Sequence, residues 1–127
     1  MKTIVAVDDN AELLENLSEI LGLAGYKVYT ADNGKAGLEV IAAHRPDLVI
    51  CDIMMPELNG LEVLKIVSKL PSEKKIPFIF LSAVSEGIDR ENIIAEQAEA
   101  YLTKPIKVHD LLNVIKARLV LEDYMHD

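Results

Sequence analysis

The sequence predicts an α/β domain in which a five-stranded parallel sheet lies between two layers of helices. Short β-branched runs alternate with longer amphipathic segments along the chain, which is the pattern of strand–helix–strand crossovers. Three of the five short runs are almost wholly apolar, as expected of strands buried on both faces. The length of 127 residues fits one domain, with an expected core from about 2 to 119 and a C-terminal tail over 120–127.

Strands and helices are expected in strict alternation. The predicted strands cover 3–7, 27–31, 47–51, 77–81 and, more weakly, 100–102. The first helix follows from the helical spacing of Leu14, Leu17 and Leu21. Gly25 stands where a C-terminal cap of that helix is expected.

The four later helices are indicated by similar signals. The second closes before Pro46, and the third is predicted from about 60 to 70 because Asn59 begins a capping-box pattern. The fourth, which is the most polar, is predicted over about 88–97. The fifth carries an apolar stripe from 108 to 119.

The composition excludes several function classes. The net charge is −8, so nucleic acid and anionic membrane surfaces are not expected as direct partners. The single cysteine, Cys51, excludes an intramolecular disulfide and a thiolate metal cluster. No stretch approaches the roughly 20 apolar residues of a membrane span, and the start lacks the apolar run of a signal peptide. A cytoplasmic location is therefore expected.

Reactive side chains follow the expected ends of the strands. In open parallel sheets, ligands bind beyond the carboxyl ends of the strands. The residues that follow the first, third, fourth and fifth strands are Asp8 with Asp9, Asp52, Ser82, and Lys104 with Pro105. If these strands are neighbours, their terminal side chains converge on one edge of the sheet.

Three carboxylates at one edge predict a cation site. Like charges that share a site raise at least one pKa unless a cation compensates them. Asp8, Asp9 and Asp52 offer hard oxygen ligands that suit Mg²⁺. Together with the ammonium of Lys104 and the hydroxyl of Ser82, they can stabilise charge on a phosphoryl group, and Asp52 can act as the nucleophile.

These residues lie in motifs that resemble the receiver domain of two-component response regulators. The resemblance runs from about residue 2 to 119. It rests on VDDN at 7–10, DLVICDIMMPELNG at 47–60, LSA at 81–83 and YLTKP at 101–105. It implies a flavodoxin-like, doubly wound five-stranded sheet with strand order 2-1-3-4-5 and five helices.

The resemblance implies a role for each acidic position. Asp52 would accept a phosphoryl group from a histidine kinase or a histidine phosphotransfer protein. Asp9 would bind Mg²⁺ directly, and Asp8 would assist, largely through water. Asp52 and the backbone carbonyl of Met54 would complete the protein ligands.

The two later motifs imply a switch. Lys104 would contact the phosphoryl group, and its peptide bond to Pro105 would be cis. Ser82 would move toward the phosphate after transfer. Tyr101, which without its motif is more simply a half-buried strand aromatic, would then turn inward. This would alter the face formed by the fourth helix, fifth strand and fifth helix, which would act on a downstream output protein or domain or form a homodimer.

Three alternatives stay open at this point. A phosphatase of the haloacid dehalogenase type also uses an aspartyl phosphate and Mg²⁺, but its motif has a second aspartate where Met54 stands. A degenerate receiver would be a constitutive interaction module. The chain could also be a receiver cut from a larger regulator or hybrid kinase. The expected chemistry is self-phosphorylation and self-dephosphorylation, without turnover of a separate substrate.

Overall fold

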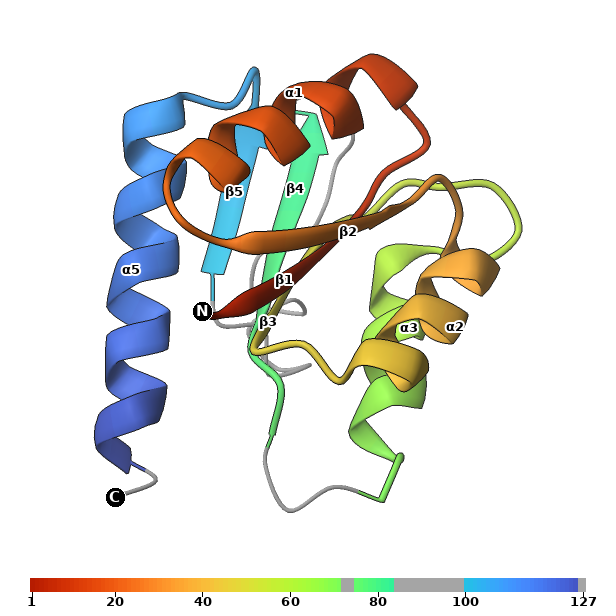
Figure 1. The fold of residues 1–127 in the computed structure, drawn as a ribbon. Coiled ribbons are helices and arrows are strands. Elements are labelled where there is room, and N and C mark those ends of the chain that lie inside the picture. The colour runs from red at the N-terminus through yellow and green to blue at the C-terminus, as the bar shows by residue number, and fades with distance from the viewer. Residues whose placement is uncertain (72–74, 84–99, 126–127) are drawn as a thin grey trace.

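A parallel sheet with the strand order β2-β1-β3-β4-β5 forms the centre of the computed structural model, which describes residues 1–71, 75–83 and 100–125 (Figure 1). The strands are β1 (Thr3–Val7), β2 (Lys27–Ala31), β3 (Leu48–Asp52), β4 (Phe78–Ala83) and β5 (Ala100–Lys104). The helices in the described part are α1 (Ala11–Leu23), α2 (Gly34–His44), α3 (Gly60–Ser68) and α5 (Val108–Met125). The predicted fold class and strand order are confirmed.

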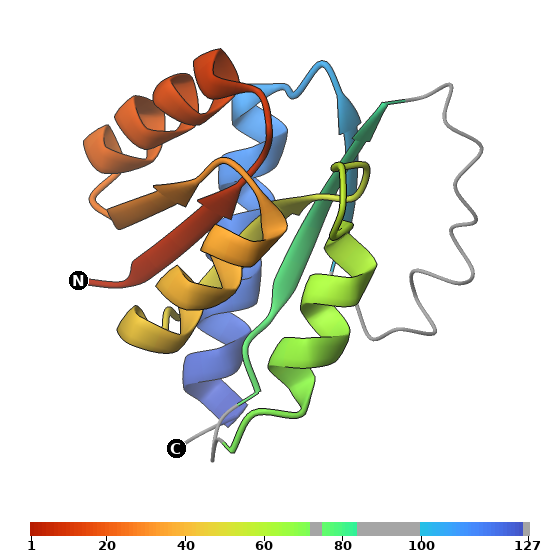
Figure 2. The same cartoon turned by 90° about the vertical axis from the view of Figure 1, so that its right-hand side faces the viewer.

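The two faces of the sheet carry separate apolar clusters because successive strand residues point to opposite sides. On one face, Ile50 packs with Leu17 of α1 and Ile115 of α5. On the other face, Phe80 packs with Val63 of α3. Figures 1 and 2 show the resulting layers, with α1 and α5 on one side of the sheet and α2 and α3 on the other.

Asparagine side chains begin three of the helices. Asn10, Asn33 and Asn59 each accept a hydrogen bond from the backbone N–H three residues later, which satisfies one free donor of the first turn. At Asn59 the Glu62 side chain returns the bond, so the predicted capping box is confirmed. Gly25 follows α1 with φ of 97°, a conformation that favours glycine.

Two predicted boundaries need correction. Helix α5 continues to Met125, so most of the predicted tail over 120–127 is helical; the sequence from 108 to 125 contains no glycine or proline that would end it. Helix α3 ends at Ser68, two residues before its predicted end. The predicted fourth helix, at about 88–97, lies outside the described residues.

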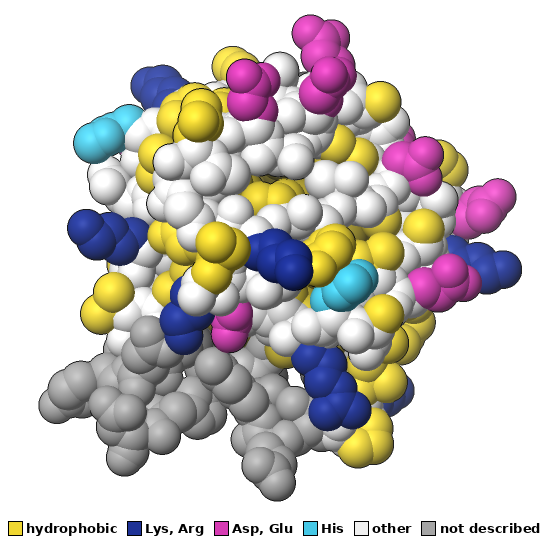
Figure 3. Space-filling model, in the orientation of Figure 1, with side chains coloured by type: hydrophobic (Ala, Val, Ile, Leu, Met, Phe, Trp, Pro, Cys, Tyr) yellow, Lys and Arg dark blue, Asp and Glu magenta, His cyan; other side chains and the backbone are white. Residues whose placement is uncertain are grey.

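The outer edge of β2 faces the viewer in Figure 3, between α1 above and α2 at the lower right. The charged side chains over α1 on this face are acidic, and hydrophobic surface is visible beneath them. This agrees with the sequence of α1, which contains three glutamates and no lysine or arginine. Helix α1 therefore contributes negative charge to this face without a lysine or arginine of its own to balance it.

Candidate functional site

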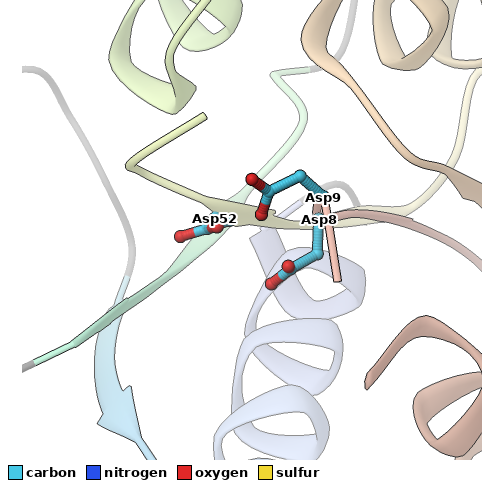
Figure 4. A group of neighbouring side chains, drawn as sticks. All are labelled: Asp8, Asp9 and Asp52. Atoms are coloured by element: carbon cyan, nitrogen blue, oxygen red, sulfur yellow. The ribbon is translucent and has the colours of Figure 1, made fainter. Parts of the chain in front are cut away.

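The carboxyl ends of β1 and β3 bring three aspartates together. Val7 and Cys51 are register partners in neighbouring strands, so the residues that follow them, Asp8 and Asp52, lie side by side. One carboxylate oxygen from each of Asp8, Asp9 and Asp52 lies within 4.8 Å of the others. Figure 4 shows the three carboxylates opening toward a shared space beyond the strands. The predicted convergence of these side chains is therefore present.

Asp8 is the most deeply placed of the three carboxylates and is completely buried. Its Oδ1 accepts a hydrogen bond of 2.9 Å from the backbone N–H of Asn10. Its Oδ2 lies 3.0 Å from Lys104 Nζ, which is an ion-pair distance, yet this buried oxygen accepts no well-directed hydrogen bond from the described residues. Asp8 Oδ2 thus keeps acceptor capacity inside the pocket.

Asp52 is also buried, at 4% exposed. Its Oδ1 accepts a bond of 3.3 Å from the backbone N–H of Met54, and its Oδ2 lies 3.4 Å from Lys104 Nζ. Burial, and next the negative charge of Asp8, raise the pKa of Asp52 to about 6, and Lys104 offsets only part of this effect. At neutral pH the Asp52 carboxylate is therefore charged, but its surroundings destabilise this charged form.

Lys104 is the counter-charge of this pocket. Burial of its side chain disfavours the ammonium, but the carboxylates of Asp8 and Asp52 together outweigh burial and raise the pKa of Lys104. The Lys104–Pro105 peptide bond is cis, as the resemblance implied. The pocket thus contains three carboxylates and one close ammonium, so one cation balances only part of the negative charge.

The donor set fits a hard divalent cation. One oxygen from each of the three carboxylates lies within 4.8 Å of the others, and the buried Oδ2 of Asp8 has acceptor capacity left. Mg²⁺ binds through carboxylate oxygens, water and phosphate, and Asp9, the exposed member of the set, leaves a solvent-facing side for them. The backbone N–H of Met54 points at Asp52.

Comparison with known proteins gives a consistent result. The family description that matches residues 4–116 is the response regulator receiver domain. The chain belongs to this family. The polar-differentiation response regulator DivK of Brucella anthropi is 34% identical over 118 residues, which cover 93% of this chain and 96% of that protein.

Solved structures of receiver domains have the same fold. The CheY-like receiver domain protein of Methanospirillum hungatei superimposes with a TM-score of 0.90 at 29% identity and 98% coverage of both chains. The chemotaxis protein CheY4 of Vibrio cholerae gives a TM-score of 0.85 at 30% identity, covering 92% of this chain and 98% of its own. The described residues of this receiver domain contain no helix that is long and apolar enough to cross a bilayer.

The receiver domain places Ser82 and Tyr101 on the strands next to the carboxylates. Ser82 is fully buried near the end of β4, one residue beyond Leu81, the register partner of Asp52. Tyr101 lies on β5 opposite Phe80, and it is partly buried against the apolar cluster beneath α2 and α3. The face predicted to respond to Tyr101 includes residues 84–99, which lie outside the described part of the chain.

Gly60 is a positioning residue that the sequence analysis missed. A Cβ atom at this position would clash with the backbone carbonyl oxygen of Asp52 and would lie 3.0 Å from Ile53 Cα. Because Gly60 has no side chain, its N–H can approach the loop and donate a bond of 2.9 Å to the Ile53 carbonyl. Two signals were present in the sequence, the Asn59–Gly60 pair at the start of a helix and the position of Gly60 at the end of the motif at 47–60.

Asn10 was also missed, and it connects two elements. Its side chain accepts a bond of 3.1 Å from the N–H of Leu13 and so begins α1. Its own backbone N–H donates to Asp8, as described above. Cys51, by contrast, is completely buried, and burial raises the pKa of its thiol well beyond the usual value.

Proposed function

We propose that this receiver domain is a phosphorylation-driven switch in which Asp52 accepts a phosphoryl group from a histidine kinase or a histidine phosphotransfer protein. The observation that supports this most directly is the convergence of Asp8, Asp9 and Asp52 around one point, with Lys104 Nζ 3.0 Å from Asp8 and 3.4 Å from Asp52. Two-component signalling takes place in the cytoplasm, which is the proposed location of the protein.

The transfer step uses the Asp52 carboxylate as nucleophile. An oxygen lone pair of Asp52 forms a bond to phosphorus as the bond from phosphorus to the donor's imidazole nitrogen breaks. The bonding electrons leave with the imidazole nitrogen of the donor. The transfer therefore needs no oxidant, reductant or further reactant. The burial that raises the pKa of Asp52 also keeps its carboxylate poorly solvated and close to Lys104.

Mg²⁺ would be held by Asp9 and Asp52, with Asp8 assisting and the Met54 carbonyl as a further ligand. When bound, it would neutralise part of the negative charge on the carboxylates and phosphoryl oxygens. Lys104 would supply a second positive charge to the phosphoryl group. After transfer, the Ser82 hydroxyl would donate a hydrogen bond to the phosphoryl group, since Ser82 lies near the end of the neighbouring strand β4.

The output step would pass through Tyr101 to the face that the predicted fourth helix, β5 and α5 form together. Phosphorylation adds charge and three acceptor oxygens, which favour one of two arrangements of a bistable element. The partner would be an output protein or domain, with a homodimer as a further activated form. The domain would not turn over a separate substrate.

Intact mass measurement tests the proposal. The protein is incubated with Mg²⁺ and acetyl phosphate, or with a phosphorylated kinase, and a mass gain of one phosphoryl group is expected. Asp52→Asn should show no gain, and Asp32→Asn, a matched change at an exposed position, should behave as wild type. A phosphoryl group that survives Asp52→Asn would contradict the assignment.

Two further outcomes would favour the alternatives. Multiple turnover of a small phosphate ester would indicate a phosphatase, which the apolar Met54 two residues after Asp52 argues against. A failure to bind Mg²⁺ in a calorimetric titration would indicate a degenerate receiver. The retained set of three carboxylates argues against that second outcome.

A further inference from the structure

A groove of about 710 Å³ lies beside the carboxyl end of β2, at the opposite edge of the sheet from β5. Its apolar lining comes from both neighbouring helices, with Leu14 of α1 on one side and Ala36 and Val40 of α2 on the other. From the strand, Thr30 lines the groove. The groove therefore follows an edge of the sheet and is flanked by one helix from each layer.

The backbone of β2 has unused hydrogen-bonding capacity on its outer side, at Thr30 within the groove and at Val28 before it. Lys27 N–H donates to the Lys2 carbonyl at 2.9 Å, and the Ala31 carbonyl accepts from Asp8 N–H at 3.1 Å. In a parallel ladder this parity directs residues 27, 29 and 31 toward β1 and turns the N–H and carbonyl groups of Val28 and Thr30 outward. Within the described residues, no strand pairs with β2 on that outer side.

The rim of the groove is acidic. Glu15 and Glu19 are exposed, four residues apart on α1, so they lie on the same helix face and repel one another. Asp32 adds a third carboxylate at the end of β2. No lysine or arginine of the described chain forms an ion pair with these three side chains, and Figure 3 shows acidic side chains on the α1 side of this face.

We propose that this groove binds an extended, basic segment of a partner protein, which adds to the sheet as a sixth strand beside β2. Val28 and Thr30 would supply main-chain hydrogen bonds, as in other complexes formed by strand addition. Apolar side chains of the segment, on the α2 side, would contact Ala36 and Val40. Lysine or arginine side chains on the α1 side would pair with Glu15 and Glu19.

The spacing of the acidic residues matches that of a strand. Residues four apart on a helix rise about 6 Å along its axis, and residues two apart on a strand are separated by about 6.6 Å. Helix α1 runs roughly along β2 in Figure 1. Basic residues at every second position of the segment can therefore meet Glu15 and Glu19 in turn, which defines the recognised sequence as alternating basic and apolar.

Charge argues against a second copy of this chain as the occupant. Two chains paired through β2 would bring the same glutamates into one interface, and each chain carries a net charge of −8. The other end of the edge carries Lys27, whose ammonium lies 5.6 Å from the centre of the Tyr29 ring. The change of charge along the edge places the basic end of the bound segment next to Asp32.

Fluorescence anisotropy with a labelled peptide of alternating lysine and valine tests this proposal. Saturating Mg²⁺ is included so that the peptide does not compete for Asp8, Asp9 and Asp52. The wild-type protein should bind this peptide, and a control peptide of the same length in which glutamate replaces lysine should not bind. The double variant Glu15→Gln/Glu19→Gln should weaken binding about tenfold, because two exposed ion pairs together contribute about 1.4 kcal/mol.

A matched double variant controls for overall charge. Glu12→Gln/Glu39→Gln removes the same two charges from exposed positions of α1 and α2 outside the groove, and should bind like wild type. Equal weakening by both double variants would mean attraction to the whole acidic surface and would overturn the proposal. Circular dichroism on each variant confirms that the fold is retained.

The strand-pairing component is tested at Thr30. Its N–H faces away from β1, so Thr30→Pro removes the outward donor without removing a ladder bond, whereas Thr30→Ala keeps it. Binding should fall with Thr30→Pro only, and the amide protons of Val28 and Thr30 should exchange more slowly with peptide bound. Unchanged binding to Thr30→Pro, or a wild-type dimer that Thr30→Pro dissociates, would overturn the proposal.

Discussion

The apolar residues of a central strand stabilise the fold, whereas the charged residue at the end of the same strand destabilises it. In β3, Leu48 to Cys51 are wholly buried and apolar, and such burial contributes about 25 cal/mol per Å². Asp52 follows directly, equally enclosed, with a pKa raised to about 6 by burial and by Asp8. The strand bodies therefore supply the stability that holds mutually repelling groups together at the strand ends.

The largest expected effect is in a strand body. Phe80 is fully buried in the cluster beneath α2 and α3, so Phe80→Ala should lower the free energy of unfolding by about 3–5 kcal/mol in urea denaturation. Ile66→Ala, at a position 40% exposed, should cost less than about 1 kcal/mol. Similar losses at the two positions would contradict the assignment of stability to the strand bodies.

Removing the counter-charge at the strand ends should have the next largest effect. Lys104→Met leaves Asp8 and Asp52 without their close ammonium, and should cost about 2 kcal/mol near neutral pH in metal-free buffer, less than for a fully buried pair. Added Mg²⁺ should recover part of this loss. Lys107→Met, at an exposed neighbouring position, should leave stability within about 0.5 kcal/mol of wild type; an equal loss there would refute the role of Lys104.

Substitutions at two glycines distinguish the steric cost of a Cβ atom from the effect of reducing chain flexibility. Gly60→Ala forces a Cβ against the Asp52 carbonyl, and should cost at least about 1 kcal/mol and slow phosphoryl incorporation. Gly22→Ala in α1 meets no atom within 4 Å, and should instead add up to about 1 kcal/mol. Urea unfolding and intact mass measure the two effects. A tolerated Gly60→Ala would show that the loop can move away from Asp52.

The smallest expected effect is on pH dependence. The raised pKa of Asp52, about 6 in the folded protein, means that the folded state binds a proton more tightly than the unfolded state. This group's contribution is thus favourable at low pH and is lost as pH rises through about 6. Metal-free wild type should gain on the order of 1 kcal/mol relative to Asp52→Asn between about pH 7.5 and pH 5, discounted because the pocket opens to solvent.

The sign of this pH dependence can be checked in two ways. Asp8→Asn removes the neighbouring negative charge, so it should lower the pKa of Asp52 and shrink the difference between the two pH values. Saturating Mg²⁺ should have the same effect. A difference that grows toward high pH would mean that Asp52 is stabilised, and not strained, by its surroundings.

The predictability of the molecule follows the same division. Strand bodies were located from their apolar runs, and the convergence of Asp8, Asp9 and Asp52 followed from parallel strand ends. Gly60 could not be assigned, because its role depends on how closely its backbone passes the Asp52 carbonyl, which the sequence does not show. The end of α5 was missed because apolar spacing stops before the helix does. The β2 groove is formed by three separate elements and has no local motif.

Asn10 connects the carboxylate site to helix α1, which borders the β2 groove. The backbone N–H of Asn10 donates to Oδ1 of Asp8, and its side chain caps the first turn of α1. A cation that shifted Asp8 would act through Asn10 on the helix that carries Glu15 and Glu19. By thermodynamic reciprocity, a cation that changes the affinity for a segment bound against α1 has its own affinity changed by the same factor when that segment binds.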